Sequence, residues 1–585
     1  MKQLMCSALA AATLFLSATT PASAGDAATP LGEPQLERPT LRSLGAYWIV
    51  KGDDNKNASV RLDYRKSGNG NWRQGQPLFR VEKGAHKTKE HGSKLDVPDD
   101  ACLFAGSALL LDPNTQYDLK LTLTDPDGGE ATTTLSAKTI AEPVAPANAR
   151  VRYVTPGDDG GSGTKADPFK GIPEADKNAQ PGDVFILLPG TYQNTRLLKS
   201  GEKGKPIIWR GGEQVVIDGQ GGARAIVASD LHDVWFENLE IRNAKYALVT
   251  HGSERIVLRR CHIHDVEHGL VATQNDKDTV NDYFIADNVF EGRSTWPRSE
   301  GIEDRRAVQV TGAGHVVAYN KMRAFGDAVD TMPSQRCEAI DFHNNDIDLM
   351  TDDGIETDYS QRNVRVFENR LINVFQGIST QPVYGGPVYV FRNAMYNVCV
   401  EPFKMHNGPS GAIFMHNTVV KNKAPLLLWT SKPISNCVYR NNLFVGTTDR
   451  YAYENQAPAE DCDYDYDGFV GGPFATFLKW NNERYKTIAD VRARAPIYKH
   501  AVHIESSNGM FASGAKPPED EKQKVAAPPP DLRLASGTAA IDAGQPLSGV
   551  NDNFSGKAPD LGAYEVGAPL PHYGPRPAPA TATAK

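Results

Sequence analysis

Residues 366–372 read VFENRLI, and the pattern returns as VFRNAMY at 390–396, FMHNTVV at 414–420 and VYRNNLF at 438–444. In each phrase β-branched and aromatic residues flank an asparagine, and helical periodicity is absent. Similar phrases extend the series back to residue 235. The residues that superpose are Asn238, Cys261, Asn288, Asn320, Asn344, Asn369, Asn393, Asn417 and Asn441, at spacings of 23, 27, 32, 24, 25, 24, 24 and 24.

A repeat near 24 residues predicts a parallel β-helix, in which each coil contributes short strands and stacks on the next coil. Asparagine tolerates the turn conformation between strands, and its amide can hydrogen-bond the asparagines above and below it. We therefore interpret the recurring asparagines as an internal ladder with a structural role.

The composition agrees with a β-rich chain of more than one domain. The 585 residues include 52 Gly and 39 Pro and are 40% hydrophobic, which favours short strands joined by turns. A chain this long exceeds a single core. The net charge of -8 argues against a nucleic-acid partner, which normally requires a basic surface.

Residues 35–143 alternate apolar and polar positions between turn residues, which predicts a small β-sandwich ahead of the β-helix. The segment LDPNTQY at 111–117 resembles the tyrosine corner of fibronectin type III domains, and Trp48 and Tyr64 stand where that family has core aromatics. The resemblance implies a spacer module, so we expect catalysis downstream of it.

The segments DPF at 167–169, PGD at 181–183 and PGTY at 189–192 resemble the opening of the pectin-lyase-like superfamily. The closing segment from 531 to 565 is similar to the end of exported proteins of this type. Over residues 150–567 the resemblance implies an all-β fold with a right-handed parallel β-helix. It leaves the reaction open, because the superfamily includes lyases, glycoside hydrolases, esterases, epimerases and adhesins.

The remaining segments predict an exported protein. Residues 1–24 read as a cleaved secretory signal, and no later run is long and apolar enough to span a membrane. We expect a periplasmic or extracellular monomer with an insertion at 450–530 and a disordered Pro/Ala tail at 568–585. Six cysteines follow the signal; Cys437 and Cys462 could form a disulfide or stay as thiols.

A second alignment of the coils predicts where the catalytic side chains lie. The coils can also be aligned on Gly269, Ala328, Gly354, Gly377 and Pro402. The apolar residue one position after each of these points inward, so the alternation of side chains along a strand predicts which residues point outward. Two positions after these residues stand Val271, Asp330, Glu356, Ser379 and Lys404. Four positions after them stand Thr273, Met332, Asp358, Gln381 and His406, and one position before them stand His268, Asp327, Asp353, Gln376 and Glu401.

Because stacked strands lie about 4.8 Å apart, this register predicts a patch of five carboxylates. Such neighbours raise one another's pKa, and paired carboxylates carry out glycoside hydrolysis. We expect a polysaccharide hydrolase that requires no cofactor. The predicted catalytic residues are Asp330, Glu356, Asp353, Asp358 and Asp327, and the predicted substrate contacts are Lys404, His406, Gln381, Trp429 and His268.

Two alternatives stay open. Lys404 or His406 as the base would suit β-elimination on a uronate polymer, with calcium held by Glu356 and Asp358. Tyr359 and the residues that follow it stand where the chondroitinase B and alginate lyase group places its base lysine, which weighs against this alternative. The second alternative is an adhesin or glycan-binding protein, in which the acidic patch is only a solvated face.

Overall fold

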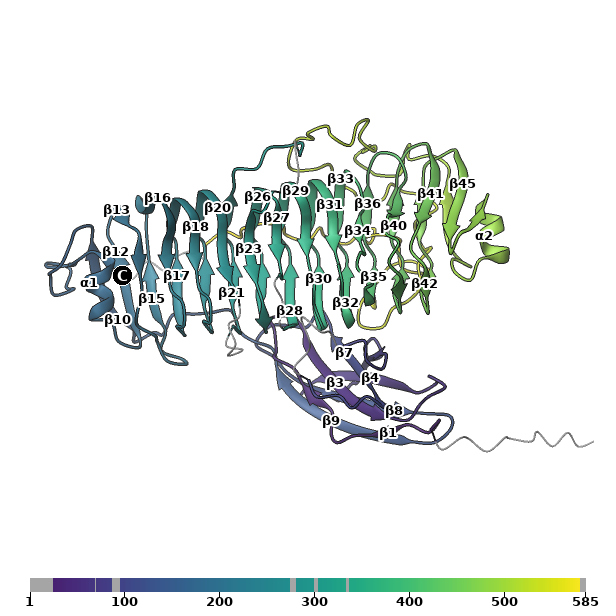
Figure 1. The fold of residues 1–585 in the computed structure, drawn as a ribbon, viewed down its shortest axis with the longest axis horizontal. Helices are drawn as coiled ribbons and strands as arrows, with labels where there is room; N and C mark the ends of the chain where they lie inside the picture. Colours follow the sequence, from purple (N-terminus) through teal and green to yellow (C-terminus); the bar gives the residue numbers. More distant parts are fainter. Residues whose placement is uncertain are drawn as a thin grey trace, which may run out of the picture.

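The chain is described by a computed structural model over residues 25–68, 70–86, 95–273, 280–298, 303–332 and 336–578. The expected signal sequence at 1–24 lies outside the described residues. The fold is all-β, with a parallel β-helix preceded by a small β-sandwich, as the repeat predicts (Figure 1). In the described part of the chain, neither helix is long and apolar enough to cross a membrane.

Two parallel sheets run the length of the β-helix, and one of them, the site sheet, carries the predicted catalytic residues. Its described strands are β13 (Gly190–Gln193), β14 (Thr195–Arg196), β16 (Val215–Val227), β18 (Glu240–Val249), β20 (His262–Ala272), β22 (Val289–Glu291), β23 (Arg306–Val310), β26 (Lys321–Phe325), β27 (Asp327–Asp330), β29 (Asp346–Glu356), β31 (Arg370–Ser379), β33 (Ala394–Val398), β34 (Phe403–Lys404), β36 (Thr418–Val420), β40 (Leu443–Val445), β44 (Gly468–Val470) and β47 (Val502–Ile504).

The back sheet lies on the other side of a continuous apolar core. Its described strands are β10 (Arg150–Thr155), β11 (Phe169–Lys170), β12 (Asp183–Leu187), β15 (Ile207–Arg210), β17 (Val234–Glu237), β19 (Val257–Arg259), β21 (Phe284–Ala286), β24 (Gly312–Ala313), β25 (Val316–Ala318), β28 (Cys337–His343), β30 (Arg362–Phe367), β32 (Tyr384–Phe391), β35 (Ser410–Met415), β38 (Ile434–Ser435), β39 (Val438–Arg440), β42 (Ala459–Glu460) and β43 (Asp463–Asp465).

Short elements close the two ends of the β-helix (Figure 1). Helix α1 (Ile172–Lys177) packs at the first coil, and α2 (Ile488–Arg494) packs at the last. A smaller sheet near the second end contains β37 (Leu426–Leu428), β41 (Asp449–Asn455), β45 (Phe474–Trp480) and β46 (Glu483–Tyr485). Such covers protect the open strand edges of a stacked fold.

The β-sandwich docks on the back sheet, on the side away from the site sheet (Figure 1). One sheet has β1 (Thr29–Pro30), β2 (Gln35–Leu36), β3 (Leu44–Lys51), β6 (Phe79–Val81) and β7 (Ala101–Ala108); the other has β4 (Ser59–Lys66), β5 (Arg73–Gln74), β8 (Gln116–Thr124) and β9 (Glu130–Lys138). The Tyr117 hydroxyl accepts a hydrogen bond from the Asp112 backbone N–H at 3.0 Å, as a tyrosine corner requires. The fibronectin type III assignment itself stays a prediction.

Buried polar contacts fix the docking. The Arg365 guanidinium donates to the Ser107 hydroxyl at 2.9 Å, and the Thr40 hydroxyl donates to Asp341 at 2.6 Å. Fully buried ionic groups need such partners. The sandwich is therefore held in one orientation against the back sheet and does not cover the site sheet.

The predicted asparagine ladder is present in the core. In Asn288, Asn320, Asn345, Asn369, Asn393, Asn417 and Asn442, each amide donates one hydrogen to the side-chain oxygen one coil later and another to a carbonyl of the preceding coil. The last acceptor is Asp467, and all eight side chains are fully buried. Each amide thus has its donors and acceptor satisfied.

The alignment was wrong by one position at three coils. Asn238, Asn344 and Asn441 occupy the turn residue just before the ladder position, and their φ angles are 53°, 56° and 58°. Asparagine tolerates this left-handed conformation, so an adjacent pair such as Asn344 and Asn345 offers two candidates for one ladder position.

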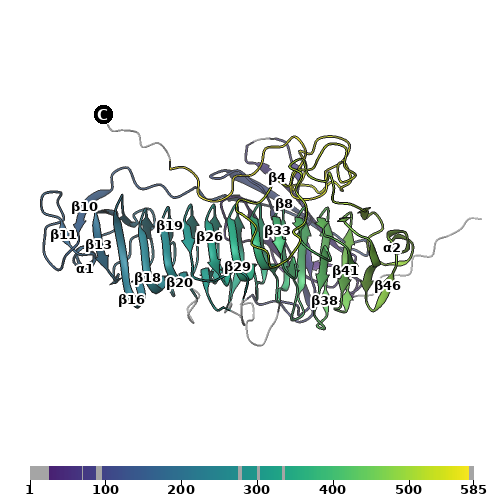
Figure 2. The same cartoon turned by 90° about the horizontal axis from the view of Figure 1, so that it is seen from above.

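The predicted insertion at 450–530 interrupts the repeat only in part. Strands β43, β44 and β47 continue the two long sheets as far as Ile504, whereas β45, β46 and α2 lie outside these sheets, between β44 and β47. The chain then folds back along the flank of the β-helix (Figure 2), where Met510 and Phe511 join an apolar cluster with Tyr396.

The tail packs further than expected. Within the predicted disordered segment 568–585, Arg576 donates to Asp287 at 2.8 Å and to Glu142 at 3.2 Å, and Gly574 donates to the Asn344 carbonyl at 3.0 Å. Ordering therefore extends to residue 578, and residues 579–585 lie outside the described part.

Cys437 and Cys462 are thiols in the structure. They lie on adjacent coils, and the neighbouring Cys462 thiol raises the pKa of Cys437.

The ladder predicts a stability effect. Asn393→Ala removes a buried amide and leaves the Asn369 N–H and the Val366 carbonyl without partners, so the free energy of unfolding should fall by about 1–3 kcal/mol. Chemical denaturation measures this change. The exposed Asn508→Ala is the control, and an equal loss in both variants would contradict a stabilising ladder.

Candidate active site

Two rows of outward side chains cross the coils of the site sheet. Cα pairing gives the first row as Val271, Gln309, Asp330, Glu356, Ser379 and Lys404, and the second contains His268, Arg306, Asp327, Asp353 and Gln376. The inward neighbours Val329, Ile355 and Ile378 are fully buried in the core. The predicted neighbours Asp330 and Glu356 therefore lie on adjacent coils.

One coil was missing from the predicted register. Strand β23 lies between β20 and β27, so Val271 pairs with Gln309 and not with Asp330. This coil brings Arg306 and Gln309 into the site. The 59 residues between Gly269 and Ala328, more than twice the usual period, were the signal that could have revealed it.

The carboxylates face outward but are buried. Asp330, Asp353 and Asp358 have no exposed surface, and Asp327 and Glu356 are 3% and 7% exposed. This differs from the exposed patch that strand alternation predicts, because alternation does not account for what crosses the sheet outside. Arg298, from the connection after β22, reaches Asp352 at 3.2 Å and lies over the Phe375 ring.

Two carboxylates are held by fixed partners. Asp330 accepts hydrogen bonds from Arg306 Nε and from Gln309 Nε2, the latter at 2.9 Å. Asp358 accepts from the Ser379 hydroxyl at 2.6 Å and from the Gln381 backbone N–H at 2.7 Å. The carboxylates of Asp330 and Asp358 therefore hold these partner residues in position.

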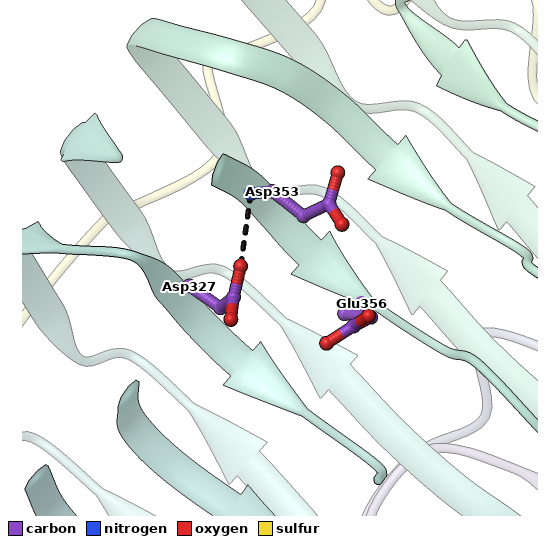
Figure 3. Close-up of side chains that lie close together, drawn as sticks. All are labelled: Asp327, Asp353 and Glu356. Atoms are coloured by element: carbon purple, nitrogen blue, oxygen red, sulfur yellow. Dashed lines mark hydrogen bonds between the residues drawn. The ribbon is translucent and has the colours of Figure 1, made fainter. Parts of the chain in front are cut away.

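Asp327, Asp353 and Glu356 form a separate group, and Figure 3 shows their carboxylates turned toward a common space. One oxygen from each lies within 4.8 Å of the others. Asp327 accepts a hydrogen bond from the Asp353 backbone N–H at 2.9 Å, and Lys404 Nζ donates to Asp353 Oδ2 at 2.6 Å. The remaining oxygen, Asp353 Oδ1, is buried without a hydrogen-bond partner.

The electrostatics of the site are unbalanced, because among the described residues five buried carboxylates have ion pairs with only Arg306 and Lys404. Burial and mutual repulsion raise the pKa of Asp327 and of Glu356 well above their usual range. Burial raises the pKa of Asp353 to about 8 despite the opposing attraction of Lys404.

Burial also raises the pKa of Asp358, to about 6. The pKa of Lys404 itself is raised, because the attraction of Asp353 and Asp358 outweighs the opposing effect of burial. The site therefore holds either extra protons or a cation. Ca²⁺ prefers carboxylate oxygens as ligands. The close carboxylates of Asp327, Asp353 and Glu356, with the unpartnered Asp353 Oδ1, therefore fit such an ion.

The predicted substrate contacts divide between the two sides of this cluster. His406 pairs with Glu401 at 2.9 Å, and the same Glu401 accepts from the Trp429 backbone N–H. The Trp429 ring is 52% exposed beside a cavity of about 340 Å³. His268 lies on the opposite side, and Gln381 contacts the cluster through its backbone.

No family model matches the chain. The uncharacterized protein YwoF of Bacillus subtilis (strain 168) is 38% identical over 101 residues, which are 16% of this chain and 22% of that protein. The chain thus spans about a fifth of the length of this relative.

Three solved structures resemble the fold at low identity. Pectate lyase Pel9A matches 71% of this chain and 96% of its own at 16% identity and a TM-score of 0.35. XylC with xylose matches 56% and 85% at 10% identity and a TM-score of 0.42. The catalytic domain of a GH87 alpha-1,3-glucanase with nigerose matches 74% and 94% at 9% identity and a TM-score of 0.25. Likeness at this level carries no assignment of activity.

The carboxylate group predicts stabilisation by calcium. Calcium at about 100 times its dissociation constant should stabilise the folded protein by about 2.7 kcal/mol, which a thermal melt detects as a higher Tm. Glu356→Gln should abolish the shift. Without calcium it should melt above the wild type at neutral pH, because glutamine does not ionise and so avoids the cost of burying a carboxylate that its neighbours repel.

Asp346→Asn is the matched control, because Asp346 lies on the same strand but pairs with Arg370 at 2.9 Å, away from the cluster. An unchanged wild-type Tm in calcium would contradict the cation site.

Proposed function

We propose that the protein is an exported polysaccharide lyase that cleaves a uronate polymer by β-elimination. The observation that carries this proposal is the contact between Lys404, a candidate base, and Asp353, which belongs to the carboxylate group that fits a cation. A hydrolase needs carboxylates alone and gives no reason for a partly buried lysine that bonds to one of them.

Elimination requires an acidified C–H, a base and a leaving group. The base takes the proton at C5 of the uronate, the electron pair forms the C4=C5 double bond, and the C4–O glycosidic bond breaks. The leaving oxygen takes a proton from water. A cation held by Asp327, Asp353 and Glu356 would neutralise the uronate carboxylate and so acidify the C5 proton.

Lys404 acts as the base only after it has lost its own proton. Its ion pair with Asp353 opposes that loss. If Asp353 held a cation, its attraction for the Lys404 ammonium would be weaker, and the pKa of Lys404 would fall. The same carboxylate would then couple cation binding to activation of the base.

Hydrolysis is the second candidate, and the pKa values favour it in one respect. At neutral pH Asp353, with a pKa of about 8, is mostly protonated, and Asp358, with a pKa of about 6, is mostly ionised. One acid and one base are what glycoside hydrolysis needs. However, Asp358 is already bonded to Ser379 and Gln381.

The deciding assay incubates the purified protein with neutral and uronate polysaccharides and follows reducing ends together with the absorbance of unsaturated uronate. We expect both signals to rise with a uronate polymer and to stop when a chelator is added. Reducing ends without absorbance would establish hydrolysis. Binding of a polymer that stays uncut would favour a glycan-binding protein.

The role of Lys404 predicts a specific loss. Lys404→Arg keeps the positive charge beside Asp353 but cannot release its proton, so the protein should keep its Tm while kcat falls about 10²–10⁴-fold. Retention of activity by this variant would contradict the assignment of the base.

The pH profile separates the two reactions. Elimination by Lys404 should become faster as pH rises, because the neutral amine is the base. Hydrolysis with Asp353 as the acid should become slower as pH rises through about 8, because the acid loses its proton. Initial rates measured across pH 5–10 distinguish the two reactions, because each rate should change on the order of tenfold per pH unit, in opposite directions.

A further inference from the structure

The second outward row continues past the carboxylates toward the N-terminal end of the β-helix. Arg224, Tyr246 and His268 stand in register on β16, β18 and β20, and Arg306 on β23 follows them. These residues line a groove of about 400 Å³ together with His251 and Thr273. The groove therefore adjoins the carboxylate cluster along the axis of the β-helix.

The groove differs from the cluster in charge. Arg306 is paired with Asp304 at the edge of the groove and with Asp330 in the cluster, so its charge is compensated. Arg224 is exposed and makes no ion pair with any other described residue. The free charge of the groove is therefore positive, beside an acidic cluster on the same sheet.

Two stacked rings, Tyr246 and His268, form part of the groove lining. The rings of Tyr246 and His268 stack 4.5 Å apart at an angle of 12°. His268 is only 4% exposed, yet its Nδ1 has no hydrogen-bond partner. Burial and the nearby Arg306 lower its pKa to about 4, so the ring is neutral and can accept or donate a hydrogen bond. A buried polar atom without a partner costs free energy unless a ligand or water satisfies it.

We propose that this groove is a subsite for a second uronate unit of the same polymer, with Arg224 pairing its carboxylate and His268 hydrogen-bonding its hydroxyl groups. The inference rests on the proposed uronate substrate. Four strand spacings of about 4.8 Å place Arg224 about 19 Å along the sheet from Asp327, so only an oligomer of several sugars can reach both. The groove would thereby select long, charged chains.

The test uses Arg224→Gln with a series of uronate oligomers of increasing length, taken from the polymer that the wild type cleaves. KM for long oligomers should rise about tenfold, because one charge-assisted hydrogen bond is lost, and kcat should not change. The shortest cleaved oligomer should be unaffected. High salt should weaken the difference, because exposed ion pairs are screened.

Arg242→Gln is the matched control, because Arg242 lies on β18 but pairs with Asp218 and Glu240, outside the groove. An equal KM for wild type and Arg224→Gln at every length would overturn the subsite while leaving the lyase intact. Cleavage of neutral polymers alone would overturn both proposals.

The role of His268 is tested in the same assay. His268→Phe keeps the stacked ring and removes both nitrogens, so KM for long oligomers should rise while the Tm is maintained. An unchanged KM would remove His268 from the subsite.

Discussion

The structure depends on one constraint, which is that every coil of the β-helix must stack on the next in the same register. The asparagine ladder enforces it, because each amide is satisfied only when the next coil presents its own amide at the same height. A slip of one residue would turn the core face outward and leave the buried amides without partners. All outward rows follow from this constraint.

The constraint also concentrates charge. Carboxylates at the same position of successive coils are forced within one strand spacing of each other, whatever their repulsion. In the site sheet this places Asp327 beside Asp353, with Glu356 nearby, in a region that solvent hardly reaches. In the described part of the chain, Arg306 and Lys404 are the cations that pair with this cluster. The stacked backbone can hold such an arrangement because the ladder and the apolar core stabilise the coils independently of it.

The same rows give the surface a direction. A basic groove with Arg224 precedes the carboxylates, and Lys404 and Trp429 follow them along the axis. A linear polymer lying along the β-helix would meet these groups in turn. Binding energy gathered in the groove would hold the chain in place while Lys404 acts on one unit.

Much of this was predictable from sequence, because the period of the repeat is a local property. It predicts the β-helix, the ladder and the adjacency of Asp330 and Glu356. The contribution of Arg306 was missed, although its coil carries the Asn288 phrase, because a long connection separates β22 from β23 and the second alignment passed over this coil. Burial of the carboxylates was not predictable either, because a repeat contains no information about the segments that cover a sheet from outside.

The most direct test of this account is a crystal structure grown with calcium replaced by a heavier cation with strong anomalous scattering. The account predicts one anomalous peak enclosed by oxygens of Asp327, Asp353 and Glu356, with Lys404 displaced from Asp353. Carboxylates that share protons, with no peak between them and Lys404 still paired, would contradict it.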